Sequence, residues 1–183
     1  MNKIYALVGM CGSGKSVCCE VFQKRGWEVV YFGGVTMAEL ERLGLEKNEE
    51  NERRVREGLR KEFGPAAFAL KLLPVIREKL KKGSVCLDGL YSWSEYKVLK
   101  EAFGENLTVT AILAPRKLRY ERISRRAVRP LTPEEAQSRD TAEIETMEKG
   151  GPIAMADLFL VNSGTLEEFQ AATESLIDEA EGN

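Results

Sequence analysis

An eight-residue glycine-rich segment, Gly9 to Ser16 (GMCGSGKS), limits the possible folds more than any other part of this chain. A short apolar run at 3–9 precedes it, and a segment with helical periodicity follows at about 15–24. The segment matches the pattern GxxxxGK[ST], which average residue frequencies produce at only about a few in 10⁵ positions. A strand, a glycine-rich turn and a helix in this order indicate a parallel sheet with helices packed against it.

Alternating strand and helix patterns continue through the rest of the chain. Strand-like runs are expected at 27–32, 84–88, 107–113 and 158–161. Helical patterns are expected across 36–82 with breaks at Gly44 and Gly64, at 93–103, at 115–128, after Thr132 and from Thr165 to about 179. We therefore predict a three-layer α/β fold, with a central parallel sheet of about five strands and helices on both faces. The length of 183 residues predicts a single domain spanning 1–183.

Composition excludes several classes of site. The chain contains no histidine, which excludes Ser-His-Asp triads, Cys-His pairs and imidazole zinc sites. The net charge of −2 argues against a protein that coats nucleic acid. Four cysteines without CxxC spacing indicate buried thiols in a reducing compartment. The first apolar run is too short for a signal or a membrane span, so we expect a cytoplasmic protein without membrane contact.

The glycine-rich segment has the properties of a phosphate-binding loop, or P-loop. Its glycines let the backbone curl with N–H groups pointing inward, and the following helix adds a partial positive charge of about +0.5. Lys15 is placed to reach the β- and γ-phosphates of a nucleotide, and the Ser16 hydroxyl to bind Mg²⁺. The loop residues expected to contact the nucleotide are Gly9, Cys11, Gly12, Ser13, Gly14, Lys15, Ser16 and Val17.

A P-loop that binds a nucleoside triphosphate also needs a carboxylate near Mg²⁺. Asp88 ends the strand-like run at 84–88, and ligands of such sheets lie beyond the carboxyl ends of the strands. We therefore expect Asp88 to be a catalytic residue and a metal ligand together with Ser16. The alternative is that Asp88 and Gly89 form only a turn.

The segment from Arg116 to Arg129 contains seven basic residues and one acid, a net charge of +6. Mobile arginines can neutralise the charge of a phosphoryl group in transfer, so we expect Arg122 and Arg126 to be catalytic and Arg122 also to contact the nucleotide. The alternatives are a solvated basic face or a nucleic-acid patch. Helical spacing places four arginines on one face: Arg119, Arg122, Arg126 and Arg129.

Here the motifs, taken in order, resemble the nucleoside-monophosphate-kinase group of P-loop kinases, and most closely the dephospho-CoA-kinase-like proteins. The resemblance covers nearly the whole chain. It implies that 34–80 bind the acceptor, that 116–140 close as a lid carrying Arg139 to the phosphates, and that Asn162 and Gly164 lie against adenine. The motifs that carry it are GMCGSGKS, LRKEFG at 59–64, LDGLYSW at 87–93, RYERISRR at 119–126, SRDTAEIE at 138–145, GGPIAMAD at 150–157 and VNSGTLEE at 161–168.

The chain departs from this resemblance at the acceptor side. Related proteins usually carry an acid after the second strand, where dephospho-CoA kinases use it to accept a ribose hydroxyl proton; this chain has Gly33 and Gly34. A phosphate acceptor is already anionic and needs no base. Arginines spaced along one face of the 49–62 helix could hold such a phosphate, although ion pairs within that helix are the alternative. The expected acceptor residues are Gly34, Arg56, Arg60 and Tyr91.

These observations predict an ATP-dependent phosphotransferase. It would use Mg²⁺ and move the γ-phosphoryl group of ATP to a small nucleotide-like acceptor, either dephospho-CoA or a nucleoside monophosphate. One alternative is an ATP-binding regulatory protein of the same fold that has lost acceptor phosphorylation, which the glycine at Gly34 favours. Another is RNA binding by the basic helix. We expect a monomer or a weak homo-oligomer.

Overall fold

The computed structural model describes residues 2–127 and 130–182. Within these ranges, five strands form one sheet in the order β2-β3-β1-β4-β5, and every neighbouring pair is parallel. The predicted parallel sheet of about five strands is confirmed. The strands are β1 (Ile4–Val8), β2 (Glu28–Tyr31), β3 (Val85–Asp88), β4 (Leu107–Leu113) and β5 (Leu158–Val161).

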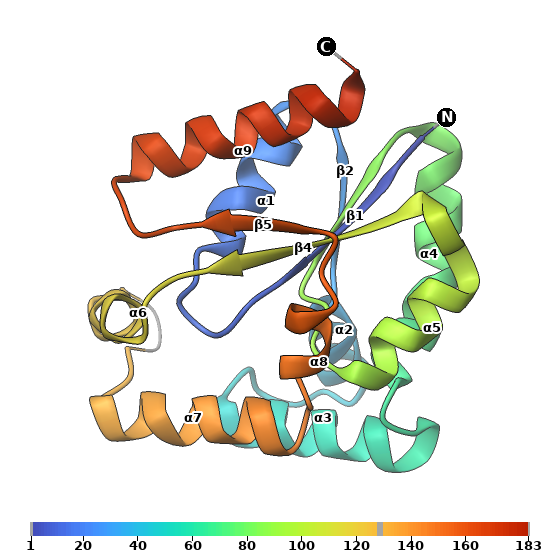
Figure 1. Ribbon diagram of the computed structural model, residues 1–183. Helices are drawn as coiled ribbons and strands as arrows, with labels where there is room; N and C mark the ends of the chain where they lie inside the picture. The colour runs from blue at the N-terminus through green and yellow to red at the C-terminus, as the bar shows by residue number, and fades with distance from the viewer. Residues whose placement is uncertain (1, 128–129, 183) are drawn as a thin grey trace.

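Helices cover both faces of this sheet (Figure 1). One face packs against α1 (Lys15–Lys24) and α9 (Leu166–Glu181), and the other against α4 (Ala67–Lys82) and α5 (Trp93–Phe103). No helix in the described ranges is both long and apolar enough to cross a membrane. The remaining helices are α2 (Gly34–Arg42), α3 (Glu49–Phe63), α6 (Arg116–Ser124), α7 (Pro133–Glu145) and α8 (Gly150–Ala154), with a 3₁₀ turn at Gly104–Asn106.

The continuous apolar run of β1 follows from its central place in the sheet. All five of its residues are buried. Ile4, Ala6 and Val8 face the cluster that includes α4 and α5. Tyr5 and Leu7 face the cluster that includes α1 and α9. A strand with a hydrophobic layer on each side has no solvated face, so alternation of polar and apolar residues disappears.

Several helix ends agree with the sequence patterns because local capping sets them. Thr132 accepts a hydrogen bond from the backbone of Glu135, whose side chain binds back, and Pro133 opens α7 as expected. The basic helix differs: predicted to run to 128, α6 ends at Ser124, whose hydroxyl donates to the Glu121 carbonyl at 3.0 Å. A serine bonded back to its own last turn competes with helix continuation.

The early end of α6 changes the expected arginine face. Arg119 and Arg122 lie within the helix, whereas Arg126 follows its end. Arg126 therefore does not continue the helical row predicted from the sequence. Arg129 lies outside the described residues.

Candidate functional site

The glycine-rich loop joins β1 to α1 at the carboxyl end of the central strand. Gly12 and Gly14 have φ values of 81° and 107°, which residues with side chains rarely adopt. A Cβ at Gly14 would also lie 2.2 Å from the Asn162 amide nitrogen. The buried hydroxyl of Ser13 has no hydrogen-bond partner among the described residues. The backbone conformation and the neighbouring atoms thus require glycine at these two positions. The unpaired Ser13 hydroxyl is a polar group that an anion bound in the loop could use.

Lys15 lies over this loop. Its Nζ donates to the carbonyl oxygens of Gly9 at 2.7 Å and Met10 at 3.2 Å. Burial and, to a smaller extent, the neighbouring Lys149 lower the pKa of Lys15 to about 8, against the opposing effect of Glu143. The ammonium group is therefore held at the loop by weak neutral acceptors in a setting that disfavours charge. An anion such as a phosphate would stabilise it.

Asp88 and Ser16 are the oxygen donors expected to hold Mg²⁺. Asp88 ends β3 and stands opposite Leu7 of β1 and Tyr31 of β2, beside the start of the loop. Burial raises the pKa of Asp88, while Lys15 opposes that effect. A carboxylate and a hydroxyl fit Mg²⁺, which takes its other ligands from phosphates and water. In the described residues no group of three cysteine, aspartate or glutamate side chains could hold a metal ion by itself.

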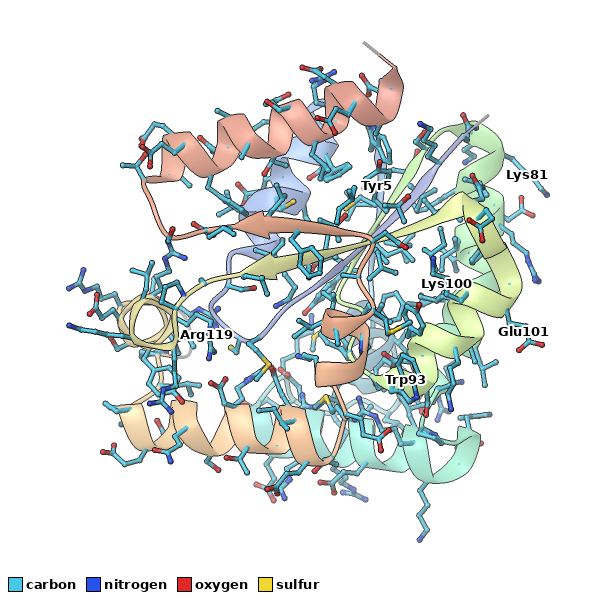
Figure 2. All side chains as sticks on the ribbon, viewed as in Figure 1. Tyr5, Lys81, Trp93, Lys100, Glu101 and Arg119 are labelled. Atoms are coloured by element: carbon cyan, nitrogen blue, oxygen red, sulfur yellow. The ribbon has the colours of Figure 1, made fainter. Side chains whose placement is uncertain are left out.

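Arg119 fastens two helices to the P-loop. Its guanidinium donates to the Cys11 carbonyl at 2.9 Å and to both carboxylate oxygens of Asp140 in α7, at 2.9 and 2.6 Å. Both side chains are nearly buried. Figure 2 shows Arg119 reaching inward from α6. Arg119 is therefore an inward anchor rather than a mobile side chain.

The two arginines predicted to be catalytic reach different parts of the loop. Arg122 donates to the backbone and side-chain oxygens of Asn162 at 3.1 and 3.0 Å, and the Asn162 amide donates to the Ser13 carbonyl at 2.8 Å. Arg126 is exposed, with one guanidinium nitrogen 3.7 Å from the Cys11 sulfur. Arg122 thus joins the segment after β5 to the loop through Asn162, and Arg126 lies at the loop itself. Gly164, two residues after Asn162, has the Glu168 side chain as its neighbour.

Sequence reasoning missed a buried ion pair at the same loop. Glu143 in α7 and Lys149, just before α8, are joined at 2.8 Å, and the Cys11 backbone N–H donates to Glu143 at 3.2 Å. The available signal was the face of α7: Ala136, Asp140 and Glu143 follow i, i+4, i+7 spacing and are all buried. Acids on such a face require buried partners. The spacing does not reveal which partners they find.

No family model matches this chain, but curated proteins of one family do. A UPF0200 protein of Thermococcus kodakarensis is 38% identical over 180 residues, which cover 96% of this chain and 97% of that protein. This chain belongs to the UPF0200 family. Another UPF0200 protein, from Aeropyrum pernix, is 41% identical over 170 residues, covering 91% of this chain and 88% of its own length.

Solved structures identify the fold of this UPF0200 protein as that of the P-loop kinases. Dephospho-CoA kinase from Campylobacter jejuni superposes with a TM-score of 0.56 at 18% identity, covering 97% of each chain. Shikimate kinase from Acinetobacter baumannii, in complex with shikimate, gives a TM-score of 0.60 at 15% identity, covering 100% of this chain and 95% of its own. At such identities the likeness concerns the fold alone.

On the predicted acceptor side, the UPF0200 chain pairs some arginines within their helix. Arg56 contacts the buried Glu52 at 3.3 Å, and Arg53 contacts Glu57 at 3.0 Å, as the alternative interpretation of this helix expected. Arg60 behaves differently. Its guanidinium lies 4.9 Å from the centre of the Phe68 ring, and burial lowers its pKa. Arg60 is thus partly buried against Phe68.

Tyr91 lies on the same side of the molecule as the buried ion pair. Its ring centre is 5.3 Å from Lys149 Nζ. Burial raises the pKa of Tyr91, with Tyr31, Asp88 and Glu95 acting in the same direction and Arg139 opposing. Arg139 itself lies 3.5 Å from Glu143 and is half exposed. Tyr91, Arg139 and the ion pair therefore form one neighbourhood beside the loop.

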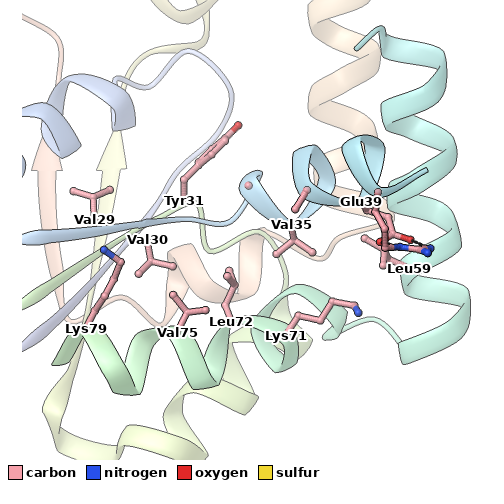
Figure 3. Close-up of a pocket in the computed structure, with 13 residues that line it drawn as sticks. Val29, Val30, Tyr31, Val35, Glu39, Leu59, Lys71, Leu72, Val75 and Lys79 are labelled. Carbon is pink, nitrogen blue, oxygen red and sulfur yellow. Dashed lines mark hydrogen bonds and ion pairs between the residues drawn. The ribbon is translucent and has the colours of Figure 1, made fainter. Parts of the chain in front are cut away.

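A cavity of about 450 Å³ lies beside β2, between α2 and α4 (Figure 3). Gly34 lines it with apolar side chains that include Val30 and Leu72. No P-loop residue lines it. The cavity is therefore separate from the phosphate cradle and lies wholly within residues 29–79, which overlap the predicted acceptor segment.

Proposed function

We propose that this UPF0200 protein is an ATP-dependent phosphotransferase that moves the γ-phosphoryl group of ATP to a small nucleotide-like acceptor. The observation that carries the proposal is the P-loop with Lys15 held over it by two backbone carbonyls. Phosphate oxygens are stronger partners for an ammonium group than neutral carbonyls. Arg126 at the same loop adds a second cation.

The nucleotide would be held along the whole loop. Backbone N–H groups of Gly12 to Ser16 bind phosphates, and Asn162 with Gly164 borders the adenine. Arg122 and Arg139 approach from the 116–140 segment, which acts as the lid. When bound, Mg²⁺ would be held by Ser16 and Asp88 and would neutralise phosphate charge. Arg119 already holds this segment against the loop, and there it would exclude water, which would otherwise receive the phosphoryl group.

The acceptor is assigned to residues 34–80 and to the start of the segment after β3. This region contains the predicted acceptor residues Gly34, Arg60 and Tyr91. Arg56 lies one helical turn from Arg60. Dephospho-CoA kinase and shikimate kinase share the fold, and the first acts on a nucleotide-like molecule. We take dephospho-CoA or a nucleoside monophosphate as the acceptor class.

A second candidate function is supported by one observation. Gly34 stands where an acid would accept the acceptor proton, and its neighbourhood is open: an added Cβ would meet only the Tyr31 ring, at 3.9 Å. A protein that kept the P-loop but lost this acid could bind ATP as a regulatory ligand. It would bind Mg-ATP without turning over any acceptor.

Replacing Lys15 by alanine tests the phosphate site. We expect Mg-ATP affinity and phosphoryl transfer to fall by about 10²-fold or more, because a preorganised charge aimed at the phosphates is removed. The folded state should persist, since Lys15 makes only two hydrogen bonds to neutral carbonyls. Isothermal titration and thermal unfolding measure the two effects. Lys24→Ala, an exposed change in the same helix, is the control. Parental affinity in Lys15→Ala would contradict the proposal.

An acceptor screen separates the two candidate functions. ATP consumption is measured with dephospho-CoA and with each nucleoside monophosphate, against the rate without acceptor. Stimulation by one compound supports the phosphotransferase. Mg-ATP binding with no stimulation by any of them supports the regulatory protein.

A further inference from the structure

A carboxylate stands inside the P-loop region. The Oε2 atom of Glu143 accepts the Cys11 backbone N–H at 3.2 Å and the Lys149 ammonium at 2.8 Å. The Glu143 side chain is 6% exposed and that of Lys149 is 2% exposed. The Lys149 backbone N–H also donates to the Glu143 carbonyl at 3.1 Å, which fixes the two residues relative to each other. A loop suited to anions is therefore bordered by one fixed, paired carboxylate.

The surroundings keep this carboxylate ionised. Burial alone would raise the pKa of Glu143, but Lys149, Lys15 and Arg139 together hold it below its ordinary value. Lys149 compensates the charge at Oε2, so the acid does not have to be protonated to remain buried. The lowered pKa makes Glu143 a weaker base than a free carboxylate, but it keeps the side chain in the ionised form that a proton acceptor needs.

The second oxygen of Glu143, Oε1, faces Arg139, one turn earlier on α7. The Nε atom of Arg139 lies 3.5 Å from Oε1. Arg139 is half exposed, and its charge acts on Tyr91. Lys149 also faces the Tyr91 ring, at 5.3 Å. Glu143 is thus bonded to the loop through Oε2 and covered at Oε1 by a half-exposed side chain, and its partner Lys149 faces Tyr91, a predicted acceptor residue.

The geometry points to Glu143 as the proton acceptor of the reaction, and to an alcohol hydroxyl rather than a phosphate as the group that is phosphorylated. This inference rests on the proposed phosphotransferase function. The acid missing at Gly34 would then be replaced by one from α7. A phosphate acceptor is already anionic and needs no base, so it would leave this carboxylate without a role.

The hydroxyl oxygen of the acceptor attacks the γ-phosphorus of ATP and forms the new P–O bond. The bond between that phosphorus and its bridging oxygen breaks, and ADP leaves with the electron pair. The hydroxyl proton passes to Oε1 of Glu143. Water is the smallest hydroxyl acceptor, so the same residue governs slow ATP hydrolysis when no other acceptor is bound.

Glu143→Gln tests this role because it preserves shape and removes the basic oxygen. Mg-ATP hydrolysis is measured at saturating nucleotide, and Mg-ATP affinity is measured by titration. We expect kcat to fall by about 10²-fold or more while Kd stays the same or becomes tighter. Glu145→Gln, an exposed glutamate in the same helix, is the matched control and should retain parental values. Equal kcat in the two variants would overturn the role of Glu143.

A second variant covers the case in which Glu143→Gln disturbs the buried pair. Glu143→Asp keeps the charge that Lys149 needs but withdraws the carboxylate by one carbon. We expect parental thermal stability and Kd with kcat reduced at least tenfold; parental kcat would overturn the inference. Faster turnover with tighter binding in Glu143→Gln would instead identify the carboxylate as an occupant of the phosphate site, which also overturns it.

The acceptor class is tested with the parental protein. Stimulation of ATP consumption by dephospho-CoA, shikimate or gluconate, and not by AMP, CMP, GMP or UMP, is the expected result. Stimulation by a monophosphate alone overturns the hydroxyl assignment. Mg-ATP binding without transfer to water, to these hydroxyls or to a monophosphate would defeat the proposed phosphotransferase itself, as would absence of Mg-ATP binding. Transfer to a monophosphate alone defeats only the hydroxyl assignment, which distinguishes the two failures.

Discussion

At the scale of single residues, Lys15 links nucleotide binding to pH. Burial and Lys149 lower its pKa to about 8, whereas bound phosphates favour the ammonium form. We therefore expect Mg-ATP Kd to change little below about pH 8 and to rise up to about tenfold per pH unit above it, because the amine must then take up a proton on binding. Titration calorimetry in buffers between about pH 7 and 10 measures this. The same slope in Lys15→Ala would assign the effect to another group.

The lowered pKa also has a consequence for stability, with a definite sign. Between pH 8 and the ordinary lysine value of 10.5, the unfolded chain binds this proton and the folded protein does not. Lys15 therefore lowers the free energy of unfolding below pH 8, and this loss disappears as pH rises from 8 to 10.5. The cost at neutral pH is what a residue placed for a ligand, rather than for the free protein, is expected to carry.

Residues of the candidate site differ in how far sequence predicts them. Gly14, Lys15 and Ser16 belong to one continuous motif whose geometry is local, so spacing alone indicates their role. Glu143 has its partner at Cys11, 132 positions earlier. No local pattern encodes a contact across such a separation, because it arises only when α7 packs beside the loop. For the same reason, pairing of Arg119 with Asp140 could not be predicted from the basic face of its helix.

At the scale of elements, one ion pair joins α6 to α7. Among the described residues, Arg119→Met would leave the buried Asp140 carboxylate with the Tyr120 hydroxyl, 3.3 Å away, as its remaining side-chain partner. We expect the free energy of unfolding to fall by about 3 kcal/mol, since an uncompensated buried charge is costly. Urea unfolding measures it. Arg116→Met, at an exposed position of the same helix, should change stability by less than about 0.5 kcal/mol.

The double variant Arg119→Met, Asp140→Asn distinguishes loss of the ion pair from the cost of leaving the Asp140 charge buried without a counter-charge. Removing both charges should recover part of the stability lost in Arg119→Met. If Arg119→Met is as stable as Arg116→Met, the pair does not hold the two helices together.

The helix boundaries show where local interactions are sufficient for a prediction from sequence. The bounds of α1 and α5 were predicted as observed, because glycines and capping residues at their ends act on adjacent backbone groups. The end of α6 was misjudged, because the hydroxyl of Ser124 competes with helix continuation in a way that periodicity does not register. The density of basic residues predicts a basic helix in this segment, but not the residue at which that helix ends.

At the scale of the whole molecule, packing and binding occupy different regions. The candidate site lies beyond the carboxyl ends of the strands. It consists of the loop, Asp88 and the ion pair that joins α6 to α7. Tyr5, Phe22 and Trp27 form an aromatic group away from it, at the start of β1, the end of α1 and the start of the β2 region, with ring centres 4.9 to 5.8 Å apart. Arg25 beside this group binds three carboxylates of α9.

This separation predicts that stability and affinity can be changed independently. Phe22 is fully buried, so Phe22→Ala should lower the free energy of unfolding by about 3–5 kcal/mol, and Phe22→Leu by less than about 1.5 kcal/mol. Under conditions where each variant remains folded, Mg-ATP Kd should stay within about twofold of the parent, the reverse of Lys15→Ala. Chemical unfolding and titration calorimetry on the same samples measure both. A loss of affinity in Phe22→Ala as large as that in Lys15→Ala would mean that the aromatic group and the P-loop behave as one cooperative unit through α1.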